Sequence, residues 1–181
     1  MMIEGRTGKF GKFRFWCDEP HAAFFGKGVG NTGCSFLNGS SSYARRNSMI
    51  LEVMIPKGAR CLYGLLGVSY NPSSDVSIRA GNVIQSVTQE IYDDSLVGDF
   101  DVVKVGLPSE YMRASFSGLK RGALSDLQLD VQFVEICYGA YGAVSSSELI
   151  FERIGASLAG LLSLKGDDFT EDSVRFFLAL D

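Results

Sequence analysis

The spacing of apolar residues along the chain predicts several strands and two helices. Residues 127–133 alternate between apolar and polar side chains, which is the period of a strand with one buried face, so a strand is expected over 127–138. Residues 49–55 form an almost unbroken apolar run that stops at Pro56 and Gly58, as a strand ended by a turn does. Further strands are expected over residues 60–66, 83–91 and 100–105.

Residues 107–122 carry matching start and stop signals for a helix. Pro108 suits the first helical position, and Glu110 lies near the positive end of the helix dipole. Gly122 follows two basic residues and suits the position at which a helix ends. The sequence therefore predicts a helix over this range.

A second helix is predicted after a glycine-containing loop. Gly139 and Gly142 allow a sharp reversal, and Ser145 with Glu148 has the spacing of a capping box, so the helix should begin at about Ser146. The apolar stripe expected to pack on a sheet is Ile150, Ile154, Leu158 and Leu161. The small residues beside it, expected to bring the helix close to that sheet, are Gly155, Ala156, Ala159 and Gly160.

Basic and aromatic residues alternate near the start of the chain, which predicts a strand with one cationic and one apolar face. The basic residues are Arg6, Lys9, Lys12 and Arg14, and the aromatic residues are Phe10, Phe13 and Phe15. The net charge is −4, yet residues 1–60 hold nine Lys or Arg against four Asp or Glu. A cationic glycine-rich loop here could meet RNA phosphates, and the alternative is an ordinary solvated strand face.

Composition indicates a globular protein. The chain has 181 residues, of which 46% are hydrophobic and 21% charged, which allows one domain with a sizeable core, or one domain with a large insertion. Since no apolar run approaches the roughly 18–20 residues of a membrane span, and the start lacks the apolar region of a secretory signal, a cytoplasmic location without membrane contact is expected.

Metal, cofactor and nucleophile motifs are missing from the sequence. The four cysteines are widely separated, and His21 is the single histidine, so neither a zinc site nor another metal site is expected. The cysteines are instead expected to be small buried apolar groups. The chain has no phosphate loop ending in Gly-Lys-Ser/Thr, so no nucleotide cofactor is expected.

The later part of the chain resembles domain IV of elongation factor G and related translational GTPases. The resemblance rests on the order strand, Gly-Leu-Pro-Ser-Glu-Tyr helix, strand, Gly-Ala-Tyr loop and Ser-Ser-Glu-Leu-Ile-Phe helix across residues 98–165. Residues 5–15 are similar to the glycine-rich loop and first strand of that family. The resemblance implies an α+β fold like ribosomal protein S5 domain 2, with two helices packed on one face of a mixed sheet. Residues 20–96 would then be a β-rich insertion of unassigned fold.

The resemblance also implies which part of the molecule contacts RNA. In that family two loops enter the decoding centre beside RNA, and they match residues 5–11 and 139–145 here. The implied nucleic-acid-binding residues are Arg6, Lys9, Lys12 and Arg14, and the implied tip-loop residues are Gly139, Tyr141, Gly142 and Ser145. The histidine and acidic residues that the family commonly shows in the second loop are absent. The implied function is therefore a non-enzymatic binding module for ribosomal or other RNA.

Two other functions are compatible with the sequence. The first is a protein-interaction or assembly module, which could form homo-oligomers through the strands of residues 20–96 and through exposed aromatic anchors. The second is a degenerate ADP-ribosyltransferase, because residues 35–38 and 50–63 are similar to a strand pair of the toxin-type enzymes. The catalytic glutamates of those enzymes are not found, since the chain reads Ser73, Ser74 and Asp75 at their place.

Overall fold

The computed structural model describes residues 1–18, 32–35, 48–70, 91–125, 134–164 and 169–178. These residues form an α+β fold with one seven-stranded sheet and three α-helices, which confirms the expected class. The strand order is β1-β2-β4-β5-β7-β3, and β6 pairs with β7 beside that path. All pairings among the described strands are antiparallel, so the mixed sheet expected from the sequence is wrong for them. The strand bounds are β1 Met2–Thr7, β2 Gly11–Cys17, β3 Thr32–Ser35, β4 Ser48–Lys57, β5 Arg60–Tyr70, β6 Val103–Val105 and β7 Val134–Gly142.

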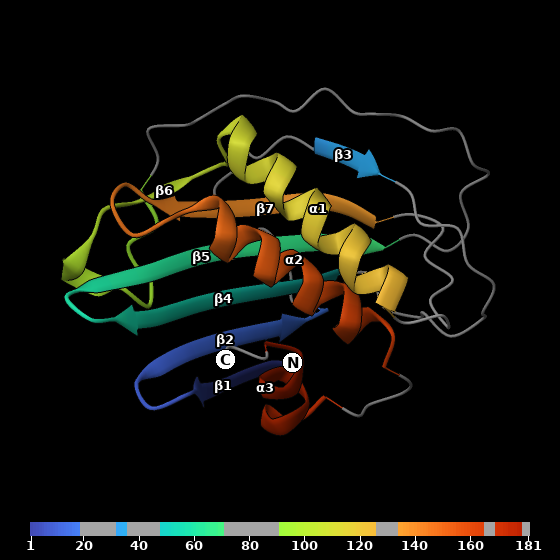
Figure 1. The fold of residues 1–181 in the computed structure, drawn as a ribbon, viewed down its shortest axis with the longest axis horizontal. Helices are drawn as coiled ribbons and strands as arrows, with labels where there is room; N and C mark the ends of the chain where they lie inside the picture. Colours follow the sequence, from blue (N-terminus) through green and yellow to red (C-terminus); the bar gives the residue numbers. More distant parts are fainter. Residues whose placement is uncertain (19–31, 36–47, 71–90, 126–133, 165–168, 179–181) are drawn as a thin grey trace.

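The β4–β5 hairpin lies at the centre of the sheet, between β2 and β7 (Figure 1). Its turn is made by Gly58 and Ala59, and Gly58 has a φ of 63°, which glycine adopts without steric cost. Residues 48–53 of β4 are buried on both faces of the sheet, which explains their unbroken apolar pattern. The strands expected over 49–55 and 60–66 are thus confirmed, and both belong to the main sheet.

Helices α1 (Ser109–Ser125) and α2 (Glu148–Leu162) cover one face of the sheet, here called the helix face (Figure 1). Ile154 and Leu158 of α2 are fully buried in the core between helices and sheet, as their spacing predicts. The prediction for the small residues of α2 is wrong. A Cβ on Gly155 would collide with the carbonyl oxygen of Ser115 in α1, and one on Gly160 would collide with the ring of Phe177 in α3. These glycines bring α2 close to the neighbouring helices.

Helix α3 (Glu171–Leu178) packs against α2 and protects the outer edge of β1. The Arg6 backbone N–H donates to Glu171 Oε1 at 3.2 Å, and Arg175 Nε donates to the Arg6 carbonyl at 2.9 Å. Side chains of the helix therefore satisfy edge groups that would otherwise offer a template for pairing with another strand. The loop expected over residues 5–11 is correspondingly shorter, because Gly5 and Arg6 lie within β1.

The segment before α2 differs from the predicted loop and capping box. Gly139 and Gly142 lie inside strand β7, and a Cβ at Gly139 would collide with the Leu107 side chain. Glycine is needed here for close packing. Helix α2 begins at Glu148 with Ser147 as its N-cap residue, which makes no side-chain capping bond. The capping-box prediction is wrong, because Ser145 donates its hydroxyl proton to Asp101.

The remaining predicted elements have mixed outcomes. Helix α1 confirms the predicted helix, and its first turn is closed by the Met112 N–H bonded to the Pro108 carbonyl at 3.0 Å. Its predicted end is wrong, because α1 continues through Gly122 to Ser125, and a Cβ on Gly122 would collide with the Ala156 carbonyl oxygen of α2. The strand expected over 100–105 is shorter, because residues 98–100 form a 3-10 helix, η2, and only β6 is extended. Residues 83–90 and 127–133 lie outside the described residues.

Candidate functional site

The face of the sheet opposite the helices, here called the second face, has its own apolar core. Residues 91–105, here called the covering segment, lie over it, held by an Ile91–Lys104 bridge and by β6 pairing with β7. Their buried side chains pack on side chains of β2, β4, β5 and β7. This second-face core consists of Trp16, Ile50, Tyr63, Leu65, Tyr92, Val97, Val103, Val105 and Ala140.

Glu52 is a fully buried carboxylate beside this core. It lies near the middle of β4, and its side chain is 0% exposed. Its Oε1 accepts hydrogen bonds from Tyr63 Oη at 2.9 Å and from the backbone N–H of Leu96 at 2.8 Å. Its Oε2 is buried and has no hydrogen-bond partner among the described residues. A half-satisfied buried carboxylate costs stability, so it is a feature that calls for a functional explanation.

Burial raises the pKa of Glu52 to about 7, because the charged form loses its hydration. The hydrogen bonds from Leu96 and Tyr63 and the positive charge of Arg14 act in the opposite direction, and they offset the effect of burial only in part. Glu52 therefore changes its charge near neutral pH. Burial and the nearby Glu52 charge also raise the pKa of the Tyr63 hydroxyl, which stays a hydrogen-bond donor.

Arg14 is the cation nearest Glu52, and several acidic groups share it. Its Nη1 lies 3.6 Å from Glu52 Oε2 and donates to the Asp94 carbonyl at 2.6 Å, while its Nε donates to Glu4 Oε1 at 2.9 Å. Although burial opposes its charge, the carboxylates of Glu52, Asp94 and Glu4 raise the pKa of Arg14. The predicted role of Arg14 in nucleic-acid binding is therefore not supported by its environment, because its charge is engaged inside the protein.

An open groove of about 590 Å³ lies at the hairpin end of the second face, where the β4–β5 turn meets the covering segment and the loop after β7. Most of its lining is apolar, and two of its side chains are strongly exposed, Phe100 at 92% and Val144 at 88%. The lining residues are Met54, Pro56, Gly58, Ala59, Arg60, Cys61, Val97, Phe100, Asp101, Val144 and Ser145.

Asp101 fixes the walls of the groove to each other. Its Oδ2 accepts from the Val144 N–H at 3.0 Å, the Ser145 N–H at 2.8 Å and the Ser145 hydroxyl at 2.6 Å, and its Oδ1 accepts from the Val102 N–H. Although burial opposes the charged form, these bonds hold the pKa of Asp101 below its usual value. The carboxylate is occupied by the protein, so its role in the groove is structural.

The groove provides little chemistry for making or breaking bonds. Cys61 is half-buried in its wall, and burial raises the pKa of this thiol, which therefore stays protonated and weakly nucleophilic at neutral pH. The Ser145 hydroxyl donates to Asp101, whose carboxylate has a pKa held below its usual value and is therefore a weak base. Among the described residues, no group of three or more His, Cys, Asp and Glu is arranged to hold a metal ion.

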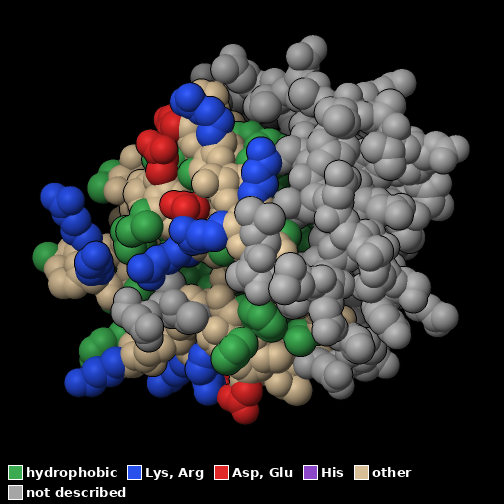
Figure 2. Space-filling model, turned by 45° about the vertical axis from the view of Figure 1, so that its right-hand side comes forward, with side chains coloured by type: hydrophobic (Ala, Val, Ile, Leu, Met, Phe, Trp, Pro, Cys, Tyr) green, Lys and Arg blue, Asp and Glu red, His purple; other side chains and the backbone are tan. Residues whose placement is uncertain are grey.

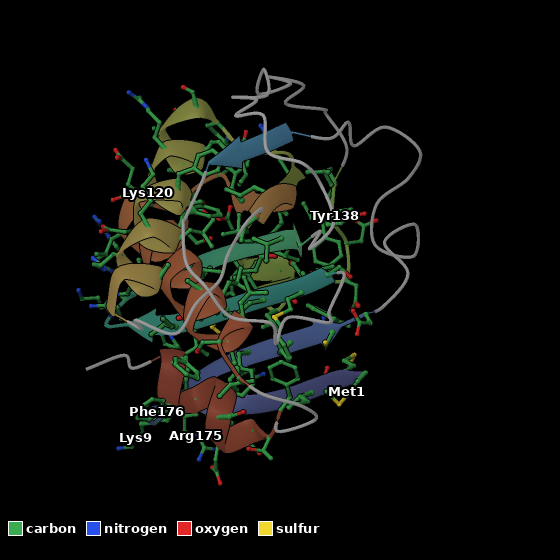
Figure 3. The ribbon with its side chains drawn as sticks, turned by 90° about the vertical axis from the view of Figure 1, so that its right-hand side faces the viewer. Met1, Lys9, Lys120, Tyr138, Arg175 and Phe176 are labelled. Atoms are coloured by element: carbon green, nitrogen blue, oxygen red, sulfur yellow. The ribbon has the colours of Figure 1, made fainter. Side chains whose placement is uncertain are left out.

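The four basic residues singled out in the sequence do not form one cationic patch. Lys12 lies directly opposite Met54, which packs on the second-face core and lines the groove, and Arg6 lies directly opposite Lys12. Both side chains therefore belong to the second face. In Figure 3, Lys9 lies on the helix side of the sheet, whereas Tyr138 points to the other side. On the surface shown in Figure 2, Lys and Arg side chains of the described residues are scattered among acidic and apolar ones.

The predicted tip-loop residues are also divided between the two faces. Ser145 lines the groove, and Gly142 lies directly behind its wall, since a Cβ there would collide with Asp101 and Ser145. Tyr141 packs against Tyr111 of α1, with ring centroids 5.8 Å apart, and therefore belongs to the helix face. Gly139 lies within β7 beside Leu107.

Sequence reasoning missed Glu52 and most of the groove. The signal for Glu52 was present, because it is the one acidic residue inside the apolar run of residues 49–55. The groove gave no such signal, since its walls come from three segments that are far apart in the chain, around residues 54–61, 97–101 and 144–145.

Comparisons of the chain with protein families, with curated proteins and with solved structures found no match. The resemblance to domain IV of elongation factor G therefore stays a hypothesis based on the quoted residues. Among the described residues, the helices are too short or too polar to cross a membrane.

Proposed function

We propose that this protein is a non-enzymatic interaction module that binds an apolar segment of a partner protein in the groove on its second face. The observation that carries this proposal is the apolar lining of the groove with Phe100 and Val144 exposed at its rim. A volume of about 590 Å³ accommodates a few side chains of a partner.

The exposed rim provides the driving force for binding. The Val144 N–H donates to Asp101 and the Phe100 N–H donates to the Val97 carbonyl, yet both side chains remain largely in water. Burying apolar surface is favourable by roughly 25 cal/mol per Å², so covering two such side chains stabilises a complex. Because the rim is fixed by hydrogen bonds before binding, little conformational entropy is lost when the partner docks.

The charge at the groove favours a partner segment that carries acidic residues. Arg60 lines the groove, and Lys57 stands opposite it in the β4–β5 turn. Residues 53–60 contain no acidic residue. Asp101, the acid in the groove wall, is already bonded to the protein and presents little free charge. We therefore expect a segment in which apolar residues lie next to Asp or Glu.

Selection from a library of random peptides displayed on phage tests the proposal. The wild-type protein should enrich peptides with clustered apolar residues beside an acidic one, and Phe100→Asp or Val144→Asp should weaken binding of the synthetic peptides at least about ten-fold, as truncation of a central anchor does. Phe176→Asp is the matched control, because Phe176 is 74% exposed on α3, outside the groove lining. Equal loss with this control, or no enrichment, would overturn the proposal.

RNA binding is the second candidate, and one observation favours it. Arg6 and Lys12 share the second face with the groove, so a single strand could place its phosphates on them and a base against Phe100. This proposal keeps the domain IV-like function and the S5 domain 2-like fold that the sequence resembles. Its support is weaker, because Arg14 is engaged by carboxylates and Lys9 lies on the helix side.

Salt dependence of RNA affinity separates the two candidates. A single-stranded RNA oligonucleotide should bind with an affinity that falls as salt rises, and Lys12→Glu should reduce that slope by about one counterion, since one phosphate contact is lost. Lys120→Glu on α1 is the control for net charge, because Lys120 lies on the helix side (Figure 3). Absence of affinity at low salt, or equal effects of both variants, would rule out RNA binding at this face.

A further inference from the structure

We propose that Glu52 acts as a proton-operated latch, in which proton uptake by its buried carboxyl group closes the covering segment and completes the groove. The effect on partner binding rests on the proposed function, whereas the effect on the covering segment does not.

Glu52 touches the covering segment directly. Its Oε1 accepts the backbone N–H of Leu96 at 2.8 Å, and the next residue, Val97, is buried in the second-face core and lines the groove. Phe100 and Asp101 follow in the same segment and form another part of the groove wall. Any movement of the backbone at Leu96 away from the sheet therefore also moves the groove lining.

The charged groups that face Glu52 come from each element packed around it. Arg14 approaches from β2, the Tyr63 hydroxyl from β5, and Tyr92 and Asp94 from the covering segment. Glu4 on β1 acts through Arg14, which it binds at 2.9 Å. Among these groups Arg14 carries the positive charge. Its Nη1 lies 3.6 Å from Glu52 Oε2, and the same guanidinium also donates to Glu4 and to the Asp94 carbonyl. The negative charge of Glu52 is thus only partly compensated.

The closed segment therefore favours the protonated carboxyl group. With the segment closed, water is excluded from Oε2, and the ionised form carries the cost of a buried and incompletely paired charge. Lifting the segment off Glu52 would let water reach the carboxylate, and its pKa would return towards its ordinary value. Because the closed state binds the proton more tightly, lower pH favours closing and higher pH favours opening.

The pH dependence of opening follows from the pKa of Glu52 in the closed and in the open state of the covering segment. The pKa of Glu52 is about 7 in the closed structure and 4.5 for an ordinary glutamate. Between about pH 6 and about pH 8 the closed state loses nearly one bound proton relative to the open state, so the equilibrium constant for opening should rise about ten-fold. Partner binding to the closed groove should weaken over the same interval in proportion to the share of molecules that open, and by reciprocity the partner should tighten proton binding to Glu52.

Native-state hydrogen exchange tests the latch without any ligand. After correction for the intrinsic rate, protection of the Leu96 amide should fall about ten-fold between about pH 6 and about pH 8 in the wild-type protein. Glu52→Gln, which keeps an acceptor for the Leu96 N–H without titrating, should remove this pH dependence. Glu4→Gln is the matched control, because Glu4 binds the same arginine but is exposed, and it should keep the pH dependence. Equal protection at both pH values in the wild type would overturn the latch.

A second measurement remains informative if Glu52→Gln fails to fold. The carboxyl carbon resonance of Glu52 in the wild-type protein should titrate with a midpoint near 7, and a midpoint near 4.5 would overturn the proposal.

A dye reports separately on the groove. Anilinonaphthalene sulfonate combines an apolar body with a fixed negative charge, and its affinity should fall with rising pH in the wild type but not in Glu52→Gln. Phe100→Ala should weaken the dye at both pH values if it occupies the groove. If exchange of the Leu96 amide depends on pH but the dye affinity does not, the latch is supported and its link to the proposed binding site is overturned.

Discussion

The two faces of the sheet are built from the same strands but differ in the groups that they bury. On the helix face, side chains such as Phe15, Leu51 and Leu66 share an apolar core with α2. The buried polar residues of these helices, Ser115 and Ser157, are uncharged and donate their hydroxyl protons to backbone carbonyls. On the second face, β4 places Ile50 beside the carboxylate of Glu52, and the cover is a segment with little regular structure. The comparison indicates that stability is concentrated on the helix face, whereas the second face retains polar chemistry and a groove at a cost in stability.

The largest expected effect is on the helix face. Leu158→Ala should lower the free energy of unfolding by roughly 2–5 kcal/mol, because Leu158 is fully buried and its loss leaves a cavity. Chemical denaturation measures the change. Leu149→Ala in the same helix is the control, since Leu149 is about half exposed, and it should change stability far less. A shift well under about 1 kcal/mol for Leu158→Ala would show that α2 is not the stabilising cover.

The next largest effect is the pH dependence of stability that the second face causes. Because burial raises the pKa of Glu52 to about 7 from an ordinary value of 4.5, its protonated form stabilises the fold, and this contribution is present below 4.5 and lost as the pH rises through 7. The full difference is about 3 kcal/mol. Denaturation of the wild type across this interval should show the loss, and Glu52→Gln should not. Parallel pH profiles for the two proteins would contradict the comparison of the two faces.

A glycine substitution tests the close packing of the helices. Gly118→Ala should destabilise the protein by roughly 1–3 kcal/mol although alanine is the better helix former, because its Cβ would collide with the carbonyl oxygen of Glu152. Ser117→Ala is the neighbouring control, because Ser117 is exposed. Equal thermal stability of the two variants would mean that α1 and α2 adjust their distance without cost.

The smallest expected effect on stability is at the groove rim. Phe100→Ala should change the free energy of unfolding by less than about 0.5 kcal/mol, because the side chain is 92% exposed and buries little surface. The same substitution should weaken ligands of the groove. A large loss of stability would instead assign Phe100 to the second-face core and would remove the main argument for a binding site.

Predictions from local pattern succeeded where a residue's role is decided by its neighbours in sequence. The helix over residues 107–122 and the strands over 49–55 and 60–66 follow from periodicity and turn residues, and the structure has all three. The capping box failed because Ser145 has a stronger partner in Asp101, which is 44 residues away in the chain. Gly139 and Gly142 led to the wrong prediction of a turn. They lack a Cβ because the backbone there packs closely against Leu107, Asp101 and Ser145.

The sequence by itself determined the α+β class, the two helices with their buried stripes and the apolar character of the central strands, because these depend on spacings of two to four residues. Only the tertiary structure decided that Glu52 is buried beside Arg14, and that hairpin, covering segment and β7–α2 loop enclose a groove. The physical reason is that burial and pairing of charges depend on which distant segments come together. That choice is made by the packing of the whole sheet.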